Sequence, residues 1–293
     1  MTPLETLTEI NLADLVAAFG WQDRPMLSGA LRKLFLRPAR RFARQMVEFD
    51  AAIGAHGLVE ASRLALRNHV KDIRVFGSDR IPDGPVLALS NHPGLSDTLA
   101  LFCALNRLDL MIIALDRPFL KALPNTSRHL YYLEADSGSR ISLVRQVASH
   151  LRAGRSVLTF PAGQIEPDPD IYAGALESLQ AWTDSAGSFA RLAPDCAILP
   201  VLVRGVIWKR AANHPLLGIK KTGDEREKLA AALQLLNTML WNTKPVTVTV
   251  QVGKPIIARE IGTTDTRVLH NALIHEMRSL IECPPVGEGI NML

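Results

Sequence analysis

The chain has 293 residues, of which 47% are hydrophobic, and its 33 Lys and Arg against 29 Asp and Glu give a formal net charge of +4. No apolar run reaches the roughly 20 residues that span a bilayer, which excludes a helical integral membrane protein. The three cysteines, Cys103, Cys196 and Cys283, are widely spaced. This spacing argues against a disulfide framework and against a metal site. We therefore expect no metal and no bound cofactor.

Residues 1–70 are predicted to form helices, because apolar side chains recur there at helical spacing. Pro25 and Pro38 are expected to break this region into pieces. Residues 1–15 carry acidic side chains and no apolar signal core. We expect a cytoplasmic location, either free or peripheral at the inner face of the membrane.

Between Leu31 and Phe49, six Lys and Arg residues are interleaved with apolar side chains, against a single Glu48. A basic amphipathic segment of this kind is suited to an anionic membrane surface. The alternative is a solvated basic face on a helix that packs through its apolar side. Nucleic acid binding is not expected, because aromatic residues are few. The residues that we assign to the membrane surface are Arg37, Arg40, Arg41 and Arg44.

From Ile73 onward, apolar strands alternate with helical patterns. This alternation predicts an α/β fold with a mixed, largely parallel sheet and helices on both faces, preceded by the N-terminal helical region. We predict two parts, a helical region at 1–70 and an α/β domain at 71–293. Pro200 lies inside a predicted strand and lacks an N–H, so we expect this strand at an edge or bulged there. Strands are predicted over 73–77, 85–90, 110–115, 131–134, 156–160, 197–203 and 246–252, and helices over 98–105, 119–123, 142–152, 188–192, 228–241 and 267–281.

His92 and Asp97 follow the buried strand at 85–90, where open α/β sheets bind their ligands. An imidazole can remove a proton from a hydroxyl when a carboxylate fixes its tautomer and orientation. We predict that Asp97 holds one ring nitrogen of His92 and leaves the other free as a base. The alternative for Asp97 is a helix cap.

A second turn, Phe160-Pro161-Ala162-Gly163-Gln164, also follows a buried strand. Its Pro and Gly can expose backbone N–H groups to an anion or a developing oxyanion. The alternative is a plain connection from strand to loop.

In this order and spacing, four segments resemble the glycerolipid acyltransferase family, over roughly residues 70–260. Residues 91–97 match its His-four-residues-Asp block and 160–163 resemble its Phe-Pro-Glu-Gly block. Residues 199–201 match its hydrophobic-Pro block and 253–256 its closing Gly-Lys-Pro turn. The resemblance implies an enzyme of phospholipid biosynthesis that moves a fatty acyl group from acyl-CoA or acyl-carrier protein to a hydroxyl of a lysolipid or glycerol-type acceptor. His92 would be the general base, oriented by Asp97.

Two blocks depart from the family pattern. Ala162, Gln164 and Ile165 stand where the family usually has Glu, Thr and Arg, and Ala135 stands about where a second arginine is expected, with Arg140 the nearest cation downstream. These departures leave open whether the acceptor carries a phosphate. The residues that the resemblance assigns to substrate binding are Asn91, Gly94, Arg140, Pro161, Ala162, Gly163 and Gln164.

Two other functions compete with acyl transfer. A serine hydrolase would need a Gly-x-Ser-x-Gly elbow, which the sequence lacks. The other alternative is a lipid- or acyl-carrier-binding protein with a degenerate acyltransferase site.

Overall fold

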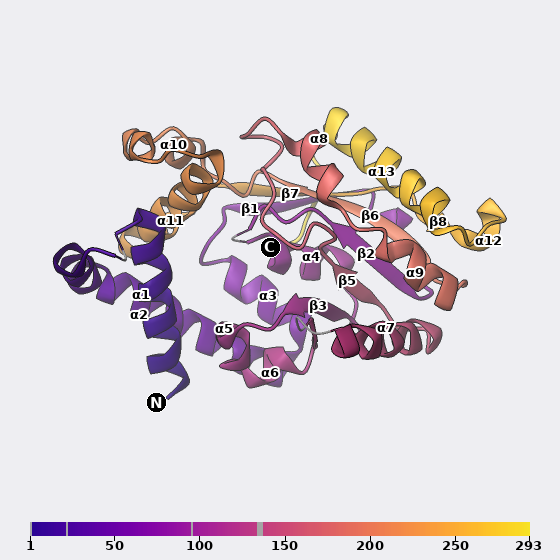
Figure 1. Cartoon of the computed structure of the whole chain (residues 1–293), viewed down its shortest axis with the longest axis horizontal. Coiled ribbons are helices and arrows are strands. Elements are labelled where there is room, and N and C mark those ends of the chain that lie inside the picture. Colours follow the sequence, from indigo (N-terminus) through magenta and orange to yellow (C-terminus); the bar gives the residue numbers. More distant parts are fainter. Residues whose placement is uncertain (1, 22, 95, 134–136) are drawn as a thin grey trace. The chain divides into compact units, whose positions relative to one another are not determined.

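The computed structural model describes residues 2–21, 23–94, 96–133 and 137–293, and the chain forms two compact units (Figure 1). The helical unit comprises Met1–Lys71, Arg117–Arg128 and Ile207–Val246. The sheet unit comprises Asp72–Asp116, His129–Val206 and Thr247–Leu293. Two stretches far along the chain, 117–128 and 207–246, therefore belong to the same unit as the N-terminal helices.

In the helical unit, one apolar cluster joins α1, α2 and α11, because each helix turns a stripe of apolar side chains inward. A capping box between Thr2 and Glu5 starts α1, and Gly20 in the left-handed region ends it. The helices are α1 (Pro3–Phe19), α2 (Pro25–His56), α3 (Leu58–Leu66), α5 (Pro118–Lys121), α6 (Pro124–Ser127), α10 (Lys209–Ala212), η3 (Pro215–Ile219) and α11 (Gly223–Trp241).

Pro38 does not break the helix that contains it, so this prediction is wrong. It lies inside α2, which continues from Pro25 to His56. A proline within a helix removes one hydrogen bond and costs about 3 kcal/mol. The turns on either side of Pro38 bury Phe35 and Ala39 in the cluster with α1 and α11, and this packing offsets the cost. The predicted break at Pro25 is confirmed, since Pro25 occupies the first turn of α2.

The sheet unit contains all nine strands of the described chain and the remaining helices. Its elements are β1 (Asp72–Phe76), η1 (Ser78–Arg80), β2 (Val86–Ser90), α4 (Asp97–Leu105), β3 (Met111–Leu115), β4 (Leu130–Leu133), α7 (Ser137–Arg152), β5 (Val157–Thr159), α8 (Ala175–Ser178), η2 (Leu179–Ala181), α9 (Ser185–Leu192), β6 (Ala197–Arg204), β7 (Thr247–Val252), β8 (Ile256–Ile257), α12 (Ala258–Ile261), α13 (Thr266–Glu282) and β9 (Ile290–Asn291).

The strand order is β4-β3-β5-β2-β6-β7-β1-β9, with β8 paired to β6. Five pairings are parallel, and the pairings β6–β7, β6–β8 and β1–β9 are antiparallel. The predicted mixed, mostly parallel α/β sheet is therefore confirmed. The predicted strands and helices recur within a few residues of their expected bounds, except that the last residue of the strand predicted at 131–134 lies outside the described residues.

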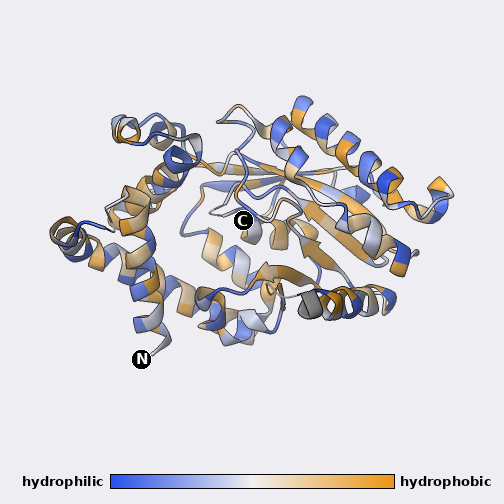
Figure 2. Ribbon diagram, in the orientation of Figure 1, coloured by the Kyte–Doolittle hydropathy of each residue, from blue (hydrophilic) through white to orange (hydrophobic). Residues whose placement is uncertain are grey.

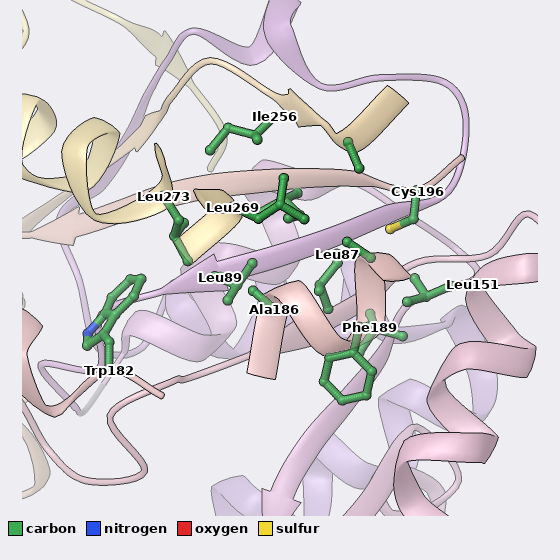
Figure 3. Packing of buried hydrophobic residues seen from close by; sticks show 14 of the residues in the cluster. Leu87, Leu89, Leu151, Trp182, Ala186, Phe189, Cys196, Ile256, Leu269 and Leu273 are labelled. Carbon is green, nitrogen blue, oxygen red and sulfur yellow. The ribbon is translucent and has the colours of Figure 1, made fainter. Parts of the chain in front are cut away.

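The main core of the sheet unit lies on one face of the sheet. There Leu87 and Leu89 of β2 pack with side chains of α7, α9 and α13 (Figure 3). The side chains of α4 lie outside this cluster, and α4 packs on β6 and β7 from the other face. Figure 2 shows the strands β2, β3 and β5 in hydrophobic colours and an alternation of both colours along α13, as expected for a helix with one buried stripe.

Pro200 lies in the middle of the sheet, so of the two predicted alternatives the edge strand is wrong and the bulge is found. β6 is buried along its whole length and pairs with β2 on one side and with β7 and β8 on the other. On that second side, three residues (253–255) stand opposite two (199–200), which is a bulge in the partner strand. The missing N–H of Pro200 falls at this interruption, while its carbonyl still accepts from the N–H of Gly253 at 2.9 Å.

None of the helices in the described residues is both long enough and apolar enough to cross a bilayer.

Candidate active site

Three neighbouring strands bring distant parts of the chain to one edge of the sheet. β2 pairs in parallel with β5 and with β6, so Leu89 lies between Thr159 and Pro200. The C-terminal ends of these strands therefore lie side by side at the same end of the sheet. We call residues 91–97, after β2, the first turn, and residues 160–170, after β5, the second turn.

His92 and Asp97 form a hydrogen-bonded pair in the first turn. Nδ1 of His92 lies 2.7 Å from Oδ2 of Asp97. The Asp97 side chain is 1% exposed, whereas 29% of the His92 side chain is exposed. The buried carboxylate holds the proton on Nδ1 and leaves Nε2 of the partly exposed ring as the acceptor. The geometry is that of a base with its orienting carboxylate.

The carboxylate of Asp97 is itself fixed from several sides. Its Oδ2 also accepts the N–H of Gly94 at 2.8 Å, and its Oδ1 accepts both the N–H and the hydroxyl of Thr98. Gly94 has φ +89°, in the left-handed region that favours glycine, which turns its N–H toward Asp97. The residue before the first turn of α4 is Ser96, whose side chain makes no capping bond. Asp97 thus starts the helix without being its N-cap residue.

The surroundings of His92 make its imidazole a stronger base. Burial lowers the pKa of His92, but the charge and hydrogen bond of Asp97 together with the charge of Glu166 outweigh burial, so the pKa is raised. The protonated imidazole is thereby stabilised between two carboxylates.

The second turn packs against the His92 ring. The ring of Phe160 stacks on the imidazole, with centroids 4.4 Å apart and planes at 30°. Gly163 has φ +65° and donates its N–H to the carbonyl of Phe160, while the buried Pro161 accepts from the N–H of Thr183. Among the described residues, the N–H of Ala162 has no hydrogen-bond acceptor.

Asn91 uses its side chain to join two strands. Its Nδ2 donates to the carbonyl of Val203 and its Oδ1 accepts the N–H of Val203, both at 2.8 Å. The residue is 4% exposed. The amide therefore ties the end of β2 to the end of β6 and positions the chain just before His92.

Glu166 is a component of the site that the sequence analysis missed. It is 1% exposed, and its Oε2 accepts the N–H of His92 at 3.1 Å. Burial raises the pKa of Glu166, and the hydrogen bonds from Trp182, Ser178 and His92 only partly counter this, so the pKa is raised. The resemblance drew attention to the missing glutamate at Ala162, whereas a glutamate stands four residues later. The available signal was a cluster of three acidic residues, Glu166, Asp168 and Asp170, alternating with prolines directly after the Phe160-Pro161 turn.

The remaining candidates for substrate binding are exposed. Arg140 lies on α7, and Gln164 lies on the second turn. Within the described ranges, neither side chain makes a hydrogen bond or an ion pair. Ala135, which the resemblance aligns with an arginine, lies outside the described residues.

The four arginines assigned to a membrane surface lie on α2 of the helical unit. Arg37, Arg40 and Arg44 are exposed. Arg41 is half-buried and donates to the carbonyl of Met239 and to Oδ1 of Asn242. Arg41 therefore also joins α2 to the end of α11.

No group of three or more His, Cys, Asp or Glu side chains in the described part of the chain is arranged to hold a metal ion. Cys103 and Cys196 are buried, and burial raises the pKa of Cys196 to about 12, which makes it unreactive at neutral pH.

Residues 72–204, which include both turns, match the Acyltransferase family. The segment that contains both turns therefore belongs to the Acyltransferase family. Among solved structures, this acyltransferase is similar to the crystal structure of the 1-acyl-sn-glycerophosphate (LPA) acyltransferase PlsC from Thermotoga maritima. The two share 16% sequence identity over 94% of this chain and 96% of that chain, with a TM-score of 0.47. No curated protein matches the sequence.

Proposed function

We propose that this acyltransferase moves a fatty acyl group from an acyl thioester, acyl-CoA or acyl-carrier protein, to a hydroxyl of a lysolipid or glycerol-type acceptor. The observation that supports this most is the 2.7 Å contact between Nδ1 of His92 and Oδ2 of Asp97, inside the segment that matches the family. A hydroxyl is a poor nucleophile at neutral pH, and a positioned base corrects this.

In the proposed reaction, Nε2 of His92 takes the proton of the acceptor hydroxyl as its oxygen attacks the thioester carbonyl. The new C–O bond produces a tetrahedral oxyanion. This intermediate collapses and breaks the C–S bond, and the departing thiolate receives the proton from His92. Asp97 keeps Nδ1 protonated and stabilises the imidazolium that forms between the two proton transfers.

The oxyanion needs a donor that is not already engaged. The N–H of Gly94 is bonded to Asp97, and that of Gly163 to Phe160. We therefore assign the N–H of Ala162, beside the stacked Phe160, as the donor that meets the oxyanion.

The charged groups that act on His92 are the carboxylates of Asp97 and Glu166. An acceptor whose phosphate lies next to its reacting hydroxyl would meet these two negative charges. The acceptor test therefore compares monoacylglycerol, which is uncharged, with lysophosphatidate and glycerol 3-phosphate.

We propose that α2 docks this enzyme on an anionic membrane surface. Arg37, Arg40 and Arg44 are exposed on it, and so are the apolar side chains of Met26 (90%) and Leu34 (69%). Cations attract anionic headgroups, and exposed apolar side chains can enter the interface.

The proposed activity is tested by incubating the purified protein with a radiolabelled acyl thioester and each acceptor. A labelled acylated lipid that depends on the acceptor supports the proposal. Released fatty acid alone contradicts it in favour of a hydrolase. Retention of the donor without turnover contradicts it in favour of a binding protein.

A further inference from the structure

Both oxygens of the buried Glu166 face hydrogen-bond donors. Oε2 accepts the backbone N–H of His92 at 3.1 Å. Oε1 accepts the indole N–H of Trp182 at 2.8 Å and the hydroxyl of Ser178 at 3.1 Å. An ionised carboxylate only accepts hydrogen bonds, so it fits a site that presents donors to both oxygens.

Glu166 also bonds to His92 through its own backbone. Its N–H donates to the carbonyl of His92 at 2.9 Å, while its side chain accepts the N–H of the same residue. Glu166 thus holds both polar groups of the His92 main chain. The hydrogen bond to Asp97 fixes the ring, and these two fix the backbone that carries it.

The groups that hold Glu166 are themselves anchored. Trp182 is 4% exposed and belongs to the main core cluster, toward the side of Leu89 and Leu273 (Figure 3). Further along the second turn, Asp168 accepts the N–H of Gly205 at 2.9 Å, just after β6. The position of Glu166 is therefore set by the core and by β6, and it transmits that position to His92.

We propose that Glu166 is a positioning residue: its carboxylate, held by Trp182, fixes the main chain of His92 and so places the imidazole. The role rests on the proposed acyl transfer, since it acts through the base of that reaction. Glu166 has no part in proton transfer itself. The site requires glutamate rather than glutamine, because an amide NH2 would have to face either the indole N–H or the N–H of His92.

Glu166→Gln is the first test. The substitution removes a negative charge near His92 and places the amide NH2 against another N–H donor. We therefore expect a lower His92 pKa, measured by NMR of labelled histidine. We also expect kcat to fall by up to about 10²-fold with KM little changed, because a small displacement of a base is costly. Glu177→Gln, at an exposed glutamate of α8, is the matched control and should change neither quantity.

The second test is rescue in the double variant Glu166→Gln with Trp182→Phe. Removing the indole N–H lets the amide NH2 occupy the position of Oε1, donate to the Ser178 hydroxyl and keep its carbonyl on the N–H of His92. We expect the double variant to recover most of the lost kcat, although Trp182→Phe alone gives no gain. Circular dichroism and thermal unfolding of each variant report folding, and the double variant keeps the test valid if Glu166→Gln does not fold.

Two results overturn the proposal. One is a folded Glu166→Gln enzyme with the kcat and His92 pKa of the wild type. The other is a double variant with lower kcat than Glu166→Gln. Failure of the proposed function would be recognised separately, because the wild-type protein would then transfer no acyl group. The His92 titration needs no substrate and tests the role of Glu166 in either case.

Discussion

The two turns of the site are built in different ways. In the first turn, the side chain of His92 is oriented by a neighbour in the sequence, since Asp97 bonds to His92 five residues away and is itself held by Gly94 and Thr98. The second turn is held from a distance. Glu166 reaches His92 across 74 positions, and Asp168 reaches Gly205 across 37.

The residues proposed for the chemical step lie in the first turn, and residues that position them lie in the second. The first turn contains the proposed base and the carboxylate that orients it, and the contact between the two is local in the sequence. The second turn contributes the stacked Phe160 and the buried Glu166, and it takes its place only when β2, β5 and β6 are aligned. Variants in the first turn should therefore affect the chemical step, and those in the second should affect position and stability.

The largest effect is expected from His92→Ala. Removing the base should lower kcat by about 10⁴-fold without unfolding the protein, because the ring is partly exposed at the edge of the sheet. Acyl transfer and thermal unfolding are measured together. His275→Ala, at an exposed histidine of α13, is the control. Near-normal turnover by His92→Ala would remove the base from the mechanism.

Asp97→Asn should lower kcat by about 10²–10³-fold and also shift its pH dependence. Because Asp97 and Glu166 raise the pKa of His92, the unprotonated base appears only as the pH rises through this raised pKa, and activity rises with it. Replacing Asp97 removes a negative charge and lowers the His92 pKa, so the acidic limb of the profile should move to lower pH. A limb at the wild-type position would mean that another group titrates there.

A third variant, Asp168→Ala, removes contacts of the second turn at a position distant from the proposed base. Asp168 is 1% exposed and accepts the N–H groups of Gly205 and Asp170 through one oxygen. Leaving these donors without an acceptor should reduce the free energy of unfolding by about 1–3 kcal/mol, measured in urea, with a smaller loss of kcat than in Asp97→Asn. The control is Asp195→Ala, which removes only an exposed ion pair with Arg259. Equal stability of the two variants would show that the second turn is not held by Asp168.

The smallest effect on chemistry is expected from reversing the charges of Arg37, Arg40 and Arg44 to Glu. Binding to phosphatidylglycerol vesicles should weaken by more than about fivefold per arginine, since loss of each cation alone removes about 1 kcal/mol of attraction and the new carboxylate adds repulsion. Turnover of a soluble acceptor should not change, since neither turn is altered. Reversing three exposed lysines of the same unit, Lys209, Lys221 and Lys228, gives the same change in net charge. Equal loss of vesicle binding in both triple variants would mean that total charge, rather than α2, directs binding.

Most of the elements could be predicted because their signals are local. β2 is an unbroken apolar run and is buried at every position. The error at Pro38 arose because the proline penalty was considered without the packing around it, whereas at Pro200 the predicted alternative of a bulge holds and that of an edge strand does not. Packing with α1 and α11 keeps α2 continuous, and a bulge opposite Pro200 lets β6 lie inside the sheet.

By itself, the sequence determined the alternation of strands and helices and the pairing of His92 with Asp97, because periodicity and a five-residue turn depend on neighbouring residues. Only the tertiary structure decided that Asn91 ties β2 to β6 and that Glu166 bonds to the main chain of His92. These bonds join residues separated by 112 and 74 positions. Such residues meet only after the parallel strands have aligned, and no local pattern of residue types encodes that alignment.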